Sequence, residues 1–206
     1  MAEFTTDWFS RYPDYWRELF ASNGWSADVP RSIIEIGSYE GRSALWMLEH
    51  LLQHPASRLH CVDTFADRQS PQSYWRKFEA NLLASPHAAK VTVSTSPSLA
   101  FMTRFVASGE RVDFVYVDGS HRAADVLEDL VLAFHATRPG GIIICDDYLK
   151  RARNGDATLD SPKLGVDAFT SLYRDRLDIP WGQPLYQLAM IKTADRPADD
   201  PGGRGG

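Results

Sequence analysis

The sequence predicts a doubly wound α/β domain, in which helices cover both faces of a mostly parallel sheet of about seven strands. Three features support this fold: an apolar run followed by a glycine turn and a helix over 31–52, a strand–helix–strand unit over 112–148, and a closing strand pair over 181–192. Parallel strands joined by right-handed crossovers end at the same edge of a sheet. The closing pair is expected to be antiparallel and to complete the sheet.

The strand–helix–strand unit reads VDFVYVDGSHRAADVLEDLVLAFHATRPGGIIICDDY. Two apolar runs, 114–117 and 142–145, flank a segment whose apolar residues recur at the three- and four-residue steps of one helix face. Each apolar run ends in aspartate. In open α/β sheets ligands bind at this carboxyl edge, so three carboxylates are expected to meet at a ligand site. They belong to Asp118, Asp146 and Asp147.

The composition indicates one globular domain with flanking segments. With 206 residues, of which 44% are hydrophobic, the chain suits a single sizeable core. Residues 31–194 are expected to form the sheet domain and residues 1–30 an aromatic-rich helical segment. Residues 195–206 are rich in Pro, Asp and Gly and are expected to be a disordered tail.

The N-terminal segment has more than one interpretation. Its helix is expected to be capped by Thr5 or Thr6 and interrupted at Pro13. The aromatic face of this helix could pack on the sheet, or the segment could act as a lid over a ligand cleft. It could equally form an interface between copies of the chain, which leaves a homo-oligomer open.

The charge and the cysteines narrow the class of protein. A net charge of −5 gives no reason to expect nucleic acid or an anionic membrane as a partner. The apolar stretches fall far short of the roughly 18 residues of a membrane span, and the N-terminus lacks the basic and apolar regions of a secretory signal. Cys61 and Cys145 are expected on strands roughly 14 Å apart, beyond the reach of a disulfide. Buried free thiols indicate a reducing compartment, so we expect a cytoplasmic protein.

A glycine turn follows the first strand, in the segment IIEIGSYEG. Gly37 and Gly41 bound the turn, and the free N–H groups at the start of the following helix would attract acceptor atoms of a ligand. A dinucleotide site needs a further glycine between them, where this chain has Tyr39. Glu35 and Glu40 add negative charge, which disfavours a diphosphate and suits a ligand with an ammonium and a sulfonium group. An NAD-dependent oxidoreductase is therefore the weaker alternative.

The second strand, LHCVD, ends in Asp63. An acid at this place can accept hydrogen bonds from both ribose hydroxyls of a bound nucleoside. The alternative is a solvated aspartate at a strand end, but the glycine turn upstream favours the ribose role.

Together these segments resemble the class I S-adenosylmethionine-dependent methyltransferases, whose fold is a Rossmann-like sheet. The resemblance rests on IIEIGSYEGRSALWML, LHCVDTF and the unit over 112–148, and it covers roughly residues 31–149. The D-G-x-H motif and the paired acid are similar to those of a small group of metal-dependent O-methyltransferases that act on sugars and antibiotic-type molecules.

The resemblance implies a binding site for S-adenosylmethionine. The methionine portion would lie at the glycine turn, the ribose at Asp63 and the adenine near Ser96. Two departures stand out: Ser94-Thr95 replaces the Gly-Asp that often precedes this serine, and Asp146-Asp147 replaces the Glu-Asp of some relatives. The cofactor-binding residues so implied are Glu35, Gly37, Ser38, Tyr39, Gly41, Ser43, Asp63, Ser96 and Asp118.

The clustered aspartates need a neutralising partner, because converging carboxylates repel one another unless they share a proton or bind a cation. Oxygen ligands select a hard cation, so we expect Mg²⁺, with Mn²⁺ or Ca²⁺ as substitutes, at Asp118, Asp146 and Asp147. Alternatively, Asp118 meets only the ammonium group of the cofactor, and either of the paired acids caps the turn that follows.

His121 opens the helix that follows Asp118 and is expected to be the general base. The helix N-terminus and a nearby cation both favour a neutral imidazole, which can take the proton of an attacking hydroxyl. The alternative role is a helix cap or a hydrogen-bond partner of Asp118. We thus expect O-methylation of a small hydroxylated molecule. A metal-independent transfer to nitrogen or oxygen, or a cofactor-binding domain without turnover, are the remaining alternatives.

Overall fold

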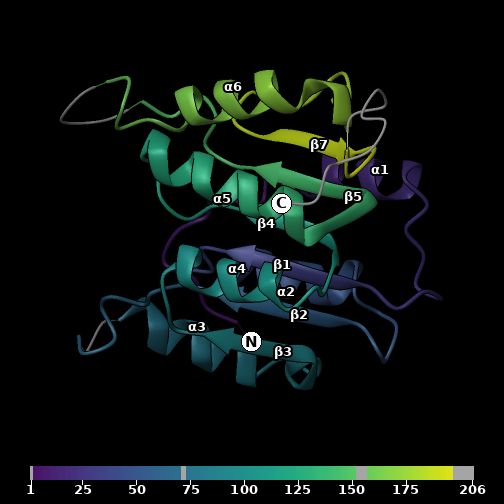
Figure 1. Cartoon of the computed structure of the whole chain (residues 1–206). Helices are drawn as coiled ribbons and strands as arrows, with labels where there is room; N and C mark the ends of the chain where they lie inside the picture. Colours follow the sequence, from purple (N-terminus) through teal and green to yellow (C-terminus); the bar gives the residue numbers. More distant parts are fainter. Residues whose placement is uncertain (1, 71–72, 152–156, 197–206) are drawn as a thin grey trace.

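The computed structural model describes residues 2–70, 73–151 and 157–196, which form one seven-stranded sheet flanked by helices (Figure 1). The strand order is β3-β2-β1-β4-β5-β7-β6. Strands β1 to β5 are parallel, while β7 runs antiparallel to both β5 and β6, so the predicted fold is confirmed. The strands are β1 (Ser32–Ile36), β2 (Arg58–Val62), β3 (Val91–Ser94), β4 (Val112–Val117), β5 (Thr137–Cys145), β6 (Leu177–Asp178) and β7 (Leu188–Lys192).

Helices cover both faces of the sheet. Helices α1, α2 and α3 contribute to the core on one face, and α4, α5 and α6 contribute to the core on the other. Neighbouring residues of the central strands point to opposite faces, as Ile33 and Ile34 do. The helices are α1 (Pro13–Ser22), α2 (Arg42–His50), α3 (Tyr74–Leu83), α4 (Ser98–Ala107), α5 (Ala123–Ala136) and α6 (Pro162–Tyr173), with 3₁₀ helices η1 (Ala88–Lys90) and η2 (Arg174–Arg176).

Helix α1 begins at Pro13, so the expected interruption of a helix at this residue is wrong. Proline fits the first turn of a helix because its missing N–H would have no partner there. The fully buried Trp16 packs against Phe114 and Tyr116 of β4, with ring centroids 5.4 and 5.0 Å apart. Its indole N–H donates to Gln187 Oε1 at 2.8 Å. Helix α1 therefore belongs to the core of the sheet domain.

The closing strand pair differs from the prediction. Strand β7 lies within the predicted range, but its partner is the two-residue β6, so the prediction of a strand within 181–187 is wrong. Pro180 and Pro184 have no N–H to donate to a strand ladder, and Gly182 has a φ of +75°. The connection between β6 and β7 therefore leaves the sheet.

Cys61 and Cys145 are both buried and free, on strands that are separated by β1 and β4, as predicted. Within the part of the chain that the structure describes, no helix has the length and apolar character needed to cross a membrane. The predicted disordered tail lies beyond residue 196 for almost all of its length and so outside the described residues. The division of the chain at residues 30 and 194 stays a prediction.

We expect Trp16→Ala to lower the free energy of unfolding by about 3–5 kcal/mol, because it removes a fully buried ring and leaves a cavity. Trp181→Ala is the matched control, since Trp181 is 99% exposed and its loss should cost less than about 0.5 kcal/mol. Urea unfolding of the two variants measures both values. Equal losses would show that α1 is not part of the cooperative core.

Candidate active site

A cavity of about 890 Å³ lies at the carboxyl edge of the parallel strands. The amides of Gly37, Asp118 and Asp146 each donate to the carbonyl of the last residue of a neighbouring strand, at 2.8 or 2.9 Å. The turns after β1, β4 and β5 are thereby held side by side. The cavity wall includes predicted cofactor residues and predicted acids alike: Gly37, Tyr39, Asp63, Ser96, Asp118, His121, Asp146 and Asp147.

The turn after β1 requires glycine at position 37, where φ is +85°. A Cβ at this position would lie 2.0 Å from the carbonyl oxygen of Asp118, so any side chain would push the turns after β1 and β4 apart. Tyr39 also has a positive φ, +48°, which is strained for a non-glycine residue. Gly41 precedes α2 and faces the ring of Phe78, away from the cavity wall.

Glu35 lies beneath this turn and has no exposed surface. Its carboxylate accepts hydrogen bonds from the hydroxyls of Ser38 at 2.6 Å and Ser43 at 2.5 Å. Burial raises the pKa of Glu35 to about 7, although these hydrogen bonds act in the opposite direction. The three side chains support the turn from within, and their direct contact with a cofactor stays a prediction.

Asp63 follows β2 and lines the cavity. Its Oδ2 accepts the N–H groups of Ser38 at 3.0 Å and Tyr39 at 3.1 Å, and its Oδ1 accepts the N–H of Phe65 at 2.8 Å. The carboxylate is therefore fixed against the glycine turn, at a place where its remaining lone pairs can meet ligand hydroxyls. Ser96 lies on the same cavity, and its hydroxyl is 2.9 Å from that of Ser94.

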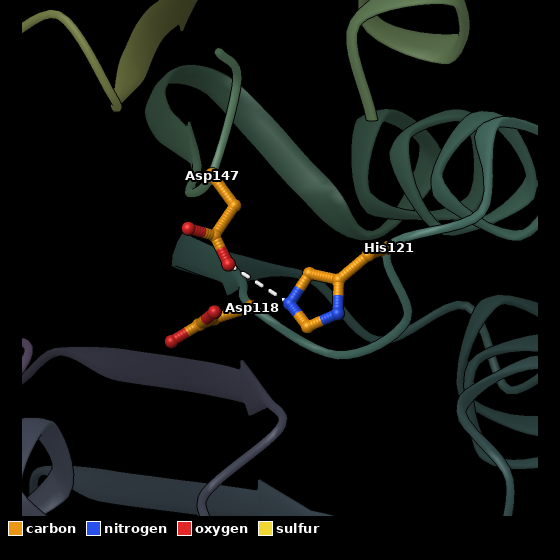
Figure 2. A group of neighbouring side chains, drawn as sticks. All are labelled: Asp118, His121 and Asp147. Carbon is orange, nitrogen blue, oxygen red and sulfur yellow. Dashed lines mark ion pairs between the residues drawn. The ribbon is translucent and has the colours of Figure 1, made fainter. Parts of the chain in front are cut away.

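Asp118, His121 and Asp147 lie close together at the turns after β4 and β5, and Figure 2 shows the His121 ring and the Asp147 carboxylate pointing toward each other. One potential ligand atom from each lies within 4.8 Å of the others, and His121 Nε2 is 2.8 Å from Asp147 Oδ2. Lys150 completes the cluster, because its Nζ lies 2.6 Å from Asp147 Oδ2 and 2.8 Å from His121 Nε2. Two of the three predicted metal ligands and the predicted base thus meet at one point.

Asp146, the third predicted ligand, lines the cavity, but its carboxylate is hydrogen-bonded to buried tyrosine side chains. The Tyr116 hydroxyl donates to Asp146 Oδ2 at 2.6 Å, and the Tyr12 hydroxyl lies 3.4 Å from Oδ1. Asp147, with a φ of +59°, donates its own N–H to Asp146 Oδ1 at 2.7 Å. The cluster that the structure brings together contains His121 in place of Asp146. A ligand role for Asp146 stays a prediction.

The charges of the cluster favour a cation. Burial raises the pKa of Asp118 well above the usual range of a carboxyl group, and the charges of Asp146 and Asp147 add to the effect. Burial acts in the same direction on Asp147, but hydrogen bonds from His121 and Lys150 outweigh it and lower the pKa of that group. Carboxylate oxygens with an imidazole nitrogen suit a divalent cation, so these residues fit a metal.

The sequence did not assign several residues of the cavity wall to the site, among them Trp8, Arg11, Asp129 and Lys150. Trp8 is 62% exposed and its ring centroid lies 5.2 Å from that of Tyr39. The aromatic content of the N-terminal segment was a signal, but no sequence pattern assigns an exposed ring to a distant turn. The signal for Lys150 was its spacing, three residues after Asp147, which lets its ammonium reach that carboxylate.

The matched family model is described as a methyltransferase domain and covers residues 34–148. This range runs from β1 through the turn after β5 and so contains the glycine turn and the acidic cluster. No curated protein matches the sequence.

Several solved structures share the fold. The O-methyltransferase TomG from Streptomyces achromogenes, involved in tomaymycin synthesis and in complex with SAM, has 19% identity and a TM-score of 0.66, with 91% of this chain and 82% of that chain covered. An O-methyltransferase from Bacillus cereus in complex with SAH has 19% identity and a TM-score of 0.66, with 92% and 84% covered. MycE, a methyltransferase from the mycinamycin biosynthetic pathway in complex with Mg, SAH and mycinamycin VI, has 14% identity and a TM-score of 0.62, with 96% and 52% covered.

The raised pKa of Glu35 predicts a stability that depends on pH. The folded protein holds a proton on Glu35 that the unfolded chain releases, so this contribution is present at low pH and is lost as the pH rises from about 4.5 through about 7. Glu35→Gln, which cannot ionise, should therefore gain about 3 kcal/mol relative to the parent protein between about pH 5 and about pH 8. Urea unfolding of both proteins at the two pH values measures this difference. A constant difference would contradict the buried, protonated carboxyl.

Proposed function

The chain belongs to the methyltransferase domain family, and on this premise we propose that it transfers the methyl group of S-adenosylmethionine to a hydroxyl group of a small molecule. The observation that carries the proposal is that one cavity joins the glycine turn and Asp63 to the cluster of Asp118, His121 and Asp147. Transfer of a group between two bound molecules requires that both bind next to each other in one space. The part of the cavity at the glycine turn and Asp63 is the cofactor half, and the part at Asp118, His121 and Asp147 is the reaction half. Two of the O-methyltransferases that share the fold are in complex with SAM or SAH, which supports this choice of cofactor.

The cofactor is proposed to lie along the carboxyl edge of β1, β2 and β4. Asp63 would accept the two ribose hydroxyls, with its carboxylate already fixed by the amides of Ser38 and Tyr39. The ammonium and sulfonium groups would lie near the turns after β1 and β4, where the carboxyl groups of Asp118, Asp146 and Asp147 line the cavity and would be stabilised by positive charge. The diphosphate of NAD would meet the same acids and is therefore disfavoured.

Asp118 and Asp147 are the residues proposed to hold a divalent cation such as Mg²⁺, with His121 and Asp146 close enough to contribute. When bound, such an ion would lower the pKa of an acceptor hydroxyl and help to orient it. The Mg in the complex of MycE supports this assignment.

In the transfer, the acceptor oxygen attacks the methyl carbon in line with the sulfur, the C–S bond breaks, and S-adenosylhomocysteine and the methylated acceptor are formed. The hydroxyl proton must be removed, and His121 is proposed to take it on Nδ1, the ring nitrogen that does not contact Asp147. Asp147 accepts from the other nitrogen, Nε2, at 2.8 Å and orients the ring. Asp147 would also stabilise the imidazolium that results.

A metal-independent transfer is the second candidate, and the position of Lys150 favours it. Its ammonium lies 2.6 Å from Asp147 Oδ2 and can supply positive charge to the cluster without an ion. In that case His121 alone activates the acceptor. The acceptor itself is proposed to be a small molecule, because it must share a cavity of about 890 Å³ with the cofactor.

We expect Asp147→Asn to abolish the binding heat of Mg²⁺ titrated into protein saturated with S-adenosylhomocysteine, because it removes a charged ligand. The affinity for S-adenosylhomocysteine should stay within about twofold, since Asp147 belongs to the reaction half of the cavity. Asp167→Asn, in which a 45%-exposed partner of Lys163 is changed, is the matched control. If the parent protein gives no Mg²⁺ heat, the metal is excluded and the transfer that relies on Lys150 replaces it.

We expect His121→Ala to slow methyl transfer by about 10²–10⁴-fold without a change in cofactor affinity, because a general base acts only in the chemical step. Formation of S-adenosylhomocysteine with a panel of hydroxylated aromatic and sugar acceptors measures the rate. Turnover that equals that of the parent protein would remove His121 from the mechanism.

A further inference from the structure

Asp129 is an acid on the cavity wall that the transfer described above does not use. It lies on α5, and only 2% of its surface is exposed, yet it lines the cavity. Its Oδ2 would be 3.9 Å from a Cβ placed on Gly119, so the carboxylate lies directly behind the turn that follows β4. Because Gly119 has no side chain, no Cβ lies between this turn and the carboxylate.

The protein does not neutralise Asp129. Among the residues that the structure describes, no basic side chain forms an ion pair with it. Burial raises the pKa of Asp129 to about 6, and the negative charges of Asp125 and Glu128 raise it further. A hydrogen bond with the Ser98 side chain acts in the opposite direction and lowers this pKa. A buried carboxylate without a cation is costly unless it accepts hydrogen bonds, so a ligand that donates one would stabilise it.

The position of Asp129 matches the nucleobase end of the proposed cofactor. The ribose is assigned to Asp63, and the reacting groups lie at the cluster of Asp118, His121 and Asp147. Residues 96–99, around the start of α4, and the part of α5 that contains Asp129 form one side of the cavity, and Trp8, Arg11 and Tyr74 also line it. Because the adenine is expected near Ser96, the base is assigned to the side between α4 and α5.

The wall that faces α5 offers no carboxylate of its own. Ser94 and Thr95 replace the Gly-Asp that often precedes this serine in the family that the sequence resembles, and the Ser96 hydroxyl is 2.9 Å from that of Ser94. Pro97 has no N–H to donate. The carboxylates on this side of the cavity come from α5, and Asp129 is the buried one among them.

We propose that Asp129 accepts a hydrogen bond from the exocyclic amino group of the cofactor's adenine and thereby selects adenosyl over 6-oxo nucleosides. This inference rests on the proposed function. An amino group donates, whereas the 6-oxo group of an inosine base only accepts and would face a carboxylate that has no proton to offer at about pH 7.5. A buried polar group left unpaired in this way discriminates strongly between two ligands of the same shape.

Calorimetry with S-adenosylhomocysteine and its deaminated analogue, S-inosylhomocysteine, at about pH 7.5 tests the inference. The parent protein should bind the adenosyl compound at least about 10-fold more tightly. In Asp129→Asn the ratio should fall below about threefold, because an amide can accept from the amino group or donate to the 6-oxo group. Glu128→Gln removes one negative charge from the exposed neighbour on the same wall and should leave the ratio unchanged.

The outcomes separate this inference from the function on which it rests. A ratio that persists in Asp129→Asn would overturn the inference and leave Asp129 as a support for α4 through Ser98. Should that variant not fold, the parent protein decides alone, because equal affinity for the two compounds would overturn the inference. Failure of the parent protein to bind S-adenosylhomocysteine would instead contradict the proposed function.

Discussion

The close contact between the turns after β1 and β4 is the constraint on which the site depends. The Asp118 carbonyl lies so close to Gly37 that a Cβ at position 37 would clash with it. The Asp118 N–H in turn donates to the carbonyl of Ile36, the last residue of β1. The glycine turn and the acidic cluster therefore form one continuous wall. A cofactor bound along the glycine turn would have its reactive group in the same space as His121 and Asp147.

Buried acidic side chains are the second organising feature. Burial raises the pKa of Glu35 beneath the turn after β1, of Asp118 at the end of β4 and of Asp129 behind the turn after β4. Acids perturbed by burial at the wall of a cavity are typical of functional sites. The N-terminal segment takes part in this arrangement through Tyr12, which directly precedes α1 and whose hydroxyl lies 3.4 Å from Asp146 Oδ1. The core of the sheet domain and the acidic edge are therefore connected.

The order of strands and helices could be predicted because apolar runs and helical periodicity are local properties of the sequence. The carboxyl-edge acids could be placed for the same reason, since an aspartate that follows a parallel strand must lie at that edge. The different surroundings of Asp146 and Asp147 could not be predicted. They depend on a positive φ at Asp147 and on the hydroxyls of Tyr12 and Tyr116, which are distant in sequence. The position of the Trp8 ring at the cavity could not be predicted either, because its contact with Tyr39 joins residues that are distant in sequence.

The most direct test of the account is calorimetric titration of S-adenosylhomocysteine into protein stripped of metal with a chelator, with NAD⁺ as the comparison ligand. The account predicts micromolar binding of S-adenosylhomocysteine, because the glycine turn and Asp63 are held in place by the protein's own hydrogen bonds. It predicts no measurable heat with NAD⁺. Binding of NAD⁺ alone would contradict the interpretation of the glycine turn and with it the proposed methyl transfer.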